Sequence, residues 1–155
     1  MKERKIRATI KTNGVAIHRH NIYTNVMSKV SEAIKEGFYL EAITLLESII
    51  ADRLESLCNQ ESQSNNNAFE CLGRLIKRAK QYQISDTWAD VLNELEEWKE
   101  KRNDALHQMA KIEDGDFTSF EERYILCKSY AMNGKRLFRN IDNEIRKYRR
   151  VRKSK

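Results

Sequence analysis

The chain has 155 residues and a net charge of +6, with 34% charged residues, 40% hydrophobic residues, 5 glycines and no proline. This length fits one domain with a hydrophobic core, and the scarcity of helix-breaking residues favours a helical fold over a disordered chain. No run of about 18 apolar residues and no apolar signal core at the N-terminus occur, which argues against a membrane protein, so we expect a soluble, cytoplasmic one.

Residues 1 to 24 are predicted to form an N-terminal arm or a short β-hairpin. Apolar residues alternate with polar ones on both sides of Asn13-Gly14, which is a hairpin turn signal. The alternating residues are Ile6, Ala8, Ile10, Val15 and Ile17. A lone hairpin is marginal in water, so it would pack on helices, pair with a second chain or be partly disordered. His18 and His20 share one face here, but two His without a nearby carboxylate or Cys make a poor metal site.

Two helices are expected between Asn25 and residue 58, with a break or bend at Gly37. The second has an apolar stripe from Ala42 to Leu57. Arg53 borders that stripe, where it either pairs with a carboxylate or points into a cleft. A polar loop over residues 59–67 ends this part of the chain.

The next predicted helix follows an Asn67/Glu70 capping box. Its apolar residues are Phe69, Leu72, Leu75, Ile76 and Ala79, and its basic face contains Arg74, Lys77, Arg78 and Lys80. We predict Arg74, Lys77 and Arg78 as RNA-binding residues; a solvated face is the commoner explanation of such a pattern.

A helix is predicted over residues 88–112, and two of its polar residues, Arg102 and His107, stand out. Apolar residues recur every three or four positions, as in an amphipathic helix: Trp88, Val91, Leu92, Leu95, Trp98, Ala105, Leu106, Met109 and Ile112. Arg102 falls where an apolar residue is due, and a guanidinium on a core stripe is costly unless it is paired or hydrated. His107 lies five residues on, about 140° round an ideal helix, on a polar face with Glu100 and Asn103.

A last helix is predicted after a Thr118/Glu121 capping box. Its apolar and small residues follow an unbroken heptad: Phe120, Tyr124, Cys127, Ala131, Gly134, Phe138, Ile141, Ile145 and Tyr148. A helix of this length spans roughly 45 Å, so part of it is expected to pack on another chain or to project. The predicted fold is therefore all-α, a bundle of four or five helices over residues 25 to 148 with the N-terminal hairpin as an addition.

The C-terminal residues 149 to 155 are predicted as a basic tail. Residues 146 to 155 contain seven Lys or Arg and no acid, and residues 1 to 20 contain six basic residues and one acid. Basic ends commonly attract phosphate backbones, although they also act as plain solubilising tails. Arg146, Lys147, Arg149 and Arg150 are accordingly predicted to bind RNA.

The stretch EKRNDALH at residues 100 to 107 resembles the Arg-x(4-6)-His motif of the HEPN superfamily. The Glu-x-Arg-Asn lead-in, the position inside a late helix, and the GFYLEAI pattern at residues 37 to 43 resemble the same family. The likeness covers roughly residues 26 to 148 at the level of pattern. Many toxins of the family have a Tyr two residues after the His, whereas this chain has Met109, so regulation at that Tyr is not implied.

The resemblance implies a metal-independent RNA endonuclease of a toxin or phage-defence type, because most active members are such enzymes and act as homodimers. His107 would transfer protons at the 2′-hydroxyl or leaving oxygen, and Arg102 would stabilise the transition state. Asn103 would orient the His or a phosphate oxygen, and Glu100 would set the local field. The implied partners are tRNA or mRNA, a second copy and an antitoxin protein; no cofactor, metal or membrane is expected.

A second class of function stays open from the sequence alone. The chain would then be a non-catalytic module, either a HEPN domain that binds nucleotides or RNA, or a helical interaction subunit. Met109 and the mildly acidic body of the chain, with 16 basic and 22 acidic residues over positions 21 to 145, favour this alternative.

Overall fold

The computed structural model describes residues 13–63 and 68–154. Within these residues all regular structure is helical, which confirms the predicted all-α bundle. The helices are α1 (Asn13–Glu36), α2 (Tyr39–Glu61), α3 (Leu72–Ala79), α4 (Trp88–Gln108) and α5 (Phe120–Lys153).

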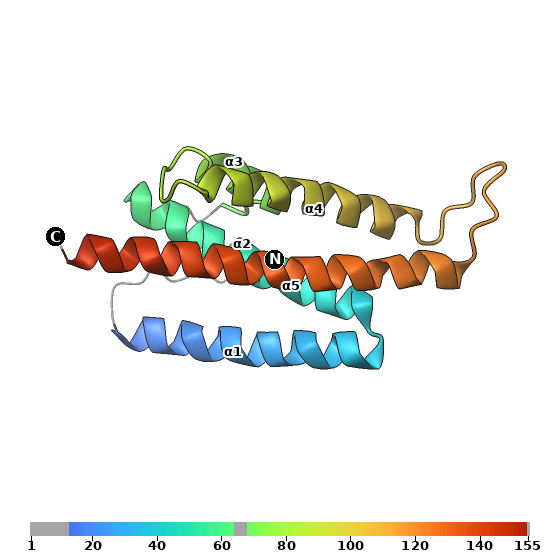
Figure 1. Cartoon of the computed structure of the whole chain (residues 1–155), viewed down its shortest axis with the longest axis horizontal. Coiled ribbons are helices and arrows are strands. Elements are labelled where there is room, and N and C mark those ends of the chain that lie inside the picture. Colours follow the sequence, from blue (N-terminus) through green and yellow to red (C-terminus); the bar gives the residue numbers. More distant parts are fainter. Residues whose placement is uncertain (1–12, 64–67, 155) are drawn as a thin grey trace.

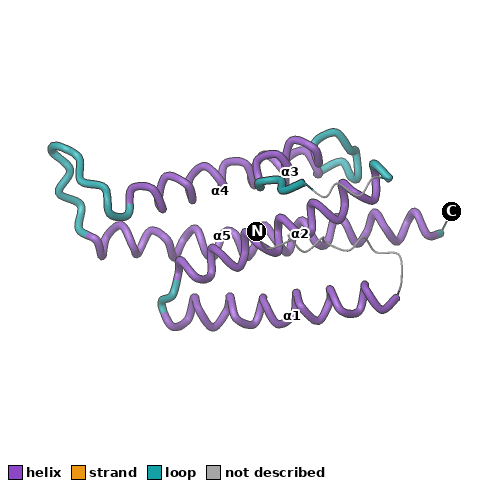
Figure 2. The backbone as a smooth tube through the Cα atoms, turned by 180° about the vertical axis from the view of Figure 1, so that it is seen from behind, coloured by secondary structure: helices purple, strands orange, loops and turns teal. Residues whose placement is uncertain are grey.

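The long helix α5 runs along the middle of the molecule, and α1, α2 and α4 pack against it (Figure 1). Helix α1 lies on one side of α5, and α4 lies on the other side with the short α3 (Figure 2). Helix α2 contacts α1, α3 and α5, and every residue from Arg53 to Asn59 is buried. The second half of α2 therefore lies at the centre of the bundle.

The predicted hairpin is wrong over the residues that can be compared. Its turn and second strand, residues 13 to 18, lie in α1, and its first strand lies outside the described residues. The reason is that the buried face of α1 begins with a charged residue, Arg19, so apolar residues alone do not mark the start of the helix. Buried or half-buried residues occur at Arg19, Tyr23, Val26, Val30 and Ala33, in steps of four and three.

The turn between α1 and α2 is fixed by a residue of α5. Gly37 has a φ of +85°, which a residue with a Cβ rarely adopts. The Tyr124 hydroxyl donates to the Gly37 carbonyl oxygen at 2.7 Å and accepts from the Tyr39 backbone N–H at 3.3 Å. The predicted break at Gly37 is therefore confirmed.

The start of α3 differs from the prediction. Asn67, one half of the predicted capping box, lies outside the described residues, and the helix begins at Leu72. Phe69 precedes the helix and is 70% exposed. Glu70 pairs with Arg78 instead of capping the helix.

Helix α5 begins and ends at other residues than predicted. Its capping box is Ser119 with Glu122, one residue after the predicted pair, because the Thr118 hydroxyl donates to Asp116 instead. The helix continues to Lys153, so most of the predicted tail is helical. The heptad face from Cys127 to Ile145 is buried within this one chain, and Phe120 at its start is exposed. Over the described residues, no helix combines the length and apolarity needed to cross a bilayer.

Candidate functional site

Arg102 is buried in the bundle, with 8% of its surface exposed. Its NH2 donates to Glu47 Oε1 on α2 at 2.6 Å, and its guanidinium carbon lies 5.8 Å from the centroid of the Trp98 ring. Within the described part of the chain its Nε has no hydrogen-bond partner. The expectation that Arg102 needs a partner is confirmed, and the partner is Glu47.

His107 lies in the last turn of α4 and is exposed. Among the described residues it makes no hydrogen bond or ion pair. Asn103 is half-buried one turn before it, and Glu100 is exposed with its Oε1 2.6 Å from Lys99 Nζ. The structure thus places Arg102 and His107 of one chain in different environments, as expected from residues about 140° apart on a helix.

The loop after the motif, residues 109–119, is held in place by Arg123 of α5. Its guanidinium donates to the Lys111 carbonyl oxygen at 2.6 Å, to Asp116 Oδ2 at 2.7 Å and to the Gln108 carbonyl oxygen. Hydrogen bonds from Thr118 and the charge of Arg123 lower the pKa of Asp116. The backbone that follows His107 is therefore fixed by side chains of the same chain.

Exposed apolar side chains are concentrated around this loop. We call residues 106–132, which contain the end of α4, the loop and the start of α5, the motif end. Its loop and the adjoining start of α5 project beyond α1 and α2 (Figure 1). Its exposed large apolar residues are Leu106, Ile112, Phe117, Phe120, Ile125, Leu126 and Met132. Ile112 and Phe117 are 92% and 94% exposed, more than expected for residues that only fill a core.

The three residues predicted to bind RNA on α3 have different environments. Arg74 and Lys77 are exposed. Arg78 is half-buried, forms an ion pair with Glu70 and donates to Asn59 Oδ1 at 3.2 Å. Only Arg74 and Lys77 are thus presented to solvent in the way that a phosphate backbone requires.

The four residues predicted to bind RNA on α5 also differ. Lys147 is exposed, and its Nζ lies 3.5 Å from Glu144 Oε1. Arg146, Arg149 and Arg150 instead line a cavity of about 270 Å³ between α1, α2 and α5, which we call the arginine pocket. Its other lining residues are Ala16, Arg19, His20, Tyr23, Arg53 and Asp142. This cluster was not predicted from the sequence, although Arg19 falls on the steps of four and three that mark the buried face of α1.

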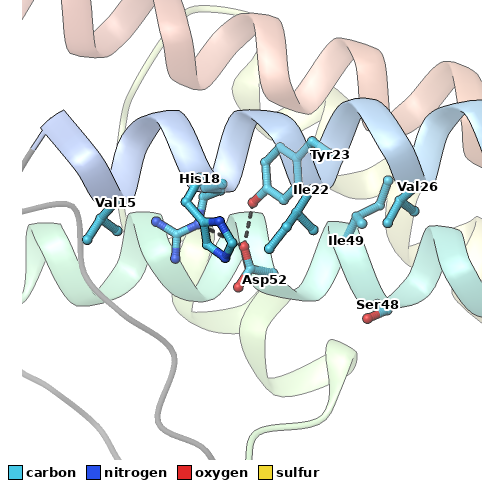
Figure 3. Close-up of a pocket in the computed structure, with 9 residues that line it drawn as sticks. Val15, His18, Ile22, Tyr23, Val26, Ser48, Ile49 and Asp52 are labelled. Carbon is cyan, nitrogen blue, oxygen red and sulfur yellow. Dashed lines mark hydrogen bonds and ion pairs between the residues drawn. The ribbon is translucent and has the colours of Figure 1, made fainter.

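A second cavity, of about 290 Å³, lies between α1 and α2 (Figure 3). It shares Arg19 and Tyr23 with the arginine pocket. The Tyr23 hydroxyl donates to Asp52 Oδ2 at 2.5 Å (Figure 3). Burial and the charge of Asp52 raise the pKa of Tyr23 far above its usual value. Across the described residues, no group of three or more His, Cys, Asp or Glu side chains is arranged to hold a metal ion.

Comparison of the chain with protein-family models, with curated proteins and with solved structures gives no match.

Proposed function

We propose that the chain is a metal-independent RNA endonuclease that acts as a homodimer, of the type found among toxins and phage-defence proteins. The observation that carries the proposal is the contrast between Arg102 and His107. Arg102 is buried beside Glu47 and Trp98, whereas His107 is exposed and makes no hydrogen bond or ion pair within the described residues. Because no hydrogen bond or ion pair of His107 stabilises the fold of the described residues, we infer that this histidine has a catalytic role.

The active site is composite in this proposal. Arg102 and His107 of one helix diverge, so two motifs that face each other across a two-fold axis would surround one phosphate more easily than one motif. The exposed apolar residues of the motif end support such an interface, since they lie on the same end of the molecule as His107. The second copy would bury Ile112 and Phe117.

Four polar residues of the motif have a part in the reaction. His107 moves protons at the 2′-hydroxyl or at the leaving oxygen. Arg102 stabilises the charge that develops on the phosphate; Glu47 accepts only one of the five N–H donors of its guanidinium. Asn103 orients His107 or a phosphate oxygen, and Glu100 contributes to the local field.

The test is RNA cleavage in the presence of EDTA by the wild-type protein and the His107→Ala variant. We expect the wild type to cut and the variant to lose two to four decades of rate, since that is about what loss of a proton-transfer group costs. Thermal unfolding of the variant should match that of the wild type because His107 is exposed. A wild-type protein that cuts no RNA, tRNA and mRNA included, would contradict the proposal.

A second candidate function is a non-catalytic module that binds nucleotides or RNA or assembles with a partner such as an antitoxin. The observation in its favour is the Arg102–Glu47 ion pair, which gives Arg102 a structural role without any reaction. Absence of cleavage by the wild type, together with RNA or nucleotide binding that the His107→Ala variant retains, would favour this function.

A further inference from the structure

The arginine pocket gathers positive charge from three helices at a site away from the motif. Arg19 comes from α1, Arg53 from α2, and Arg146, Arg149 and Arg150 from α5. Arg19 and Arg53 are buried, with 8% and 5% of their surface exposed. Arginine is rarely buried without a charged partner, so the surroundings of these groups need an explanation.

Two carboxylates hold part of the cluster in place. Asp52 Oδ2 accepts from Arg19 Nε at 3.0 Å. Asp142 places one oxygen 2.8 Å from Arg53 Nε and the other 2.8 Å from Arg146 Nε. These two acids fix the directions of three guanidinium groups. They do not balance five arginines, so the described part of the cluster keeps an excess of positive charge.

Arg19 and Arg149 meet at a neutral hydroxyl group. Arg19 NH1 donates to Ser56 Oγ at 3.3 Å, and Arg149 NH2 donates to the same oxygen at 3.2 Å. Two cations that share one uncharged acceptor repel each other, and a hydroxyl cannot offset that repulsion. An anion placed between them would.

Arg149 shows most clearly that the positive charge of the cluster is not compensated. It is half-buried, and its Nε has no hydrogen-bond partner among the described residues. Burial, together with the charges of Arg53 and Arg19, lowers the pKa of Arg149 to about 10. The segment outside the described residues before α1 contains a single acid, Glu3, and five basic residues, so it adds more positive than negative charge.

We propose that the arginine pocket binds the phosphate group of a phosphate monoester or inorganic phosphate. Arg149, Arg19 and Arg150 would donate to the phosphate oxygens, and Asp52 and Asp142 would position the arginines. A phosphate dianion fits better than a carboxylate because it offsets two charges and offers more oxygens to guanidinium groups. The volume of about 270 Å³ takes the phosphate and a small part of what is attached to it.

This site is separate from the proposed endonuclease site and does not depend on it. None of the pocket residues belongs to the motif end. The His107→Ala variant should bind phosphate as the wild type does, so a failure of the cleavage test leaves this proposal standing, and the reverse also holds.

The first experiment measures phosphate binding by calorimetry and by thermal unfolding, against sodium chloride of equal ionic strength. Phosphate should raise the unfolding temperature of the wild type above its value in chloride, because a ligand of the folded state stabilises it by mass action. The Arg149→Gln variant should bind phosphate about tenfold or more weakly, as expected for one lost charge-assisted hydrogen bond. Lys128→Gln removes an exposed charge elsewhere on α5 and should leave binding within about twofold.

A second variant protects the test against a folding defect. Arg150 lines the same pocket but is exposed, so Arg150→Gln should fold like the wild type and still weaken phosphate binding several-fold. Equal unfolding temperatures in phosphate and chloride, or full phosphate affinity in both pocket variants, would overturn the proposal.

The source of the phosphate is resolved by three further ligands: adenosine 5′-monophosphate and one RNA oligonucleotide with either a 5′-phosphate or a 5′-hydroxyl. Tighter binding of the monophosphate than of inorganic phosphate assigns the pocket to a nucleotide. Preference for the 5′-phosphorylated RNA, lost in Arg149→Gln, assigns it to an RNA end. Equal binding of both RNAs without any response to the small phosphates would reject a monoester site.

Discussion

Glu47 of α2 and Arg102 of α4 form an ion pair across the bundle, with 2.6 Å between Oε1 and NH2. The Arg102 side chain is 10% exposed and that of Glu47 is 34% exposed. Breaking a buried pair costs more than replacing both partners, because the remaining charge stays desolvated. The same contact therefore offers a way to separate the structural role of Arg102 from its proposed catalytic role.

We expect Glu47→Leu to lower the free energy of unfolding by about 1–3 kcal/mol, since it leaves the Arg102 guanidinium unpaired. The Glu47→Leu/Arg102→Met double variant should be more stable than Glu47→Leu alone. Urea unfolding of the two single variants and the double variant measures the coupling. The exposed pair of Arg136 and Glu94 serves as the control, and its removal should cost at most about 1 kcal/mol. Strictly additive effects at Glu47 and Arg102 would contradict a stabilising pair.

Gly134 of α5 packs directly on the Trp98 ring, and we expect Gly134→Ala to destabilise the protein by about 1–3 kcal/mol. An added Cβ would lie 2.7 Å from Cζ2 of that ring, which is closer than such atoms approach. Trp98 is 1% exposed and its Nε1 donates to the Tyr130 carbonyl oxygen at 2.8 Å, so the ring has little freedom to move.

Gly73→Ala is the matched control for Gly134→Ala, because it is also a glycine-to-alanine change within a helix. Its added Cβ would meet only the flexible end of Lys99, at 3.4 Å. This variant should gain up to about 1 kcal/mol, the usual advantage of alanine over glycine in a helix. Chemical unfolding measures the free energy of unfolding of both variants. Equal effects would show that the contact between Gly134 and Trp98 does not set the spacing between α4 and α5.

Local periodicity was enough to predict the central helices. The stripe through Leu95 and Trp98 is buried as expected, and the pattern also identified Arg102 as a charge that needs a partner. The pattern could not name that partner, because Glu47 lies 55 residues earlier in the chain. The spacing of apolar residues indicates which face of a helix is buried. It does not indicate which other helix packs against that face.

Neither the start of α1 nor the arginine pocket could be predicted from local sequence patterns, and the physical reason is the same for both. Arg19 occupies a core position because its Nε donates to Asp52, 33 residues away. Arg149 donates to Ser56 across 93 residues of sequence. A basic C-terminal run looks like a solvated tail until folding places it against two other helices. Charged residues therefore mark these sites only after the tertiary contacts are known.

Tyr23 provides a prediction on pH. Burial and Asp52 raise its pKa in the folded state above the ordinary value of 10.0, so the folded protein keeps the phenol protonated while the unfolded chain loses the proton. The contribution of Tyr23 to stability is thus fully present below pH 10 and decreases as the pH rises above it. Tyr23→Phe should be less stable at pH 7 by about 1–3 kcal/mol, because Asp52 loses a donor, yet its stability should fall less steeply above pH 10. Urea unfolding from pH 7 to pH 11 measures both slopes, and parallel slopes would contradict the prediction.

The last prediction concerns the motif end as a homodimer interface. Phe117 is 94% exposed and lies in the loop that follows α4, and Leu126 is 54% exposed and lines a cavity with Ala105 and Gln108 near the end of α4. Sedimentation of the wild type at micromolar concentration should give a species near twice the chain mass of 18.3 kDa. The Phe117→Ser/Leu126→Ser variant should sediment as a monomer and lose RNA cleavage, because each copy then lacks half of the composite site. The variant should keep the helical content of the wild type by circular dichroism, since exposed side chains add little to the core of one chain. Phe38→Ser is the control: it removes a 58% exposed aromatic at the turn between α1 and α2 and should leave both dimerisation and cleavage intact. A wild type that stays monomeric at all concentrations, or a monomeric variant that still cuts RNA, would rule out the shared active site.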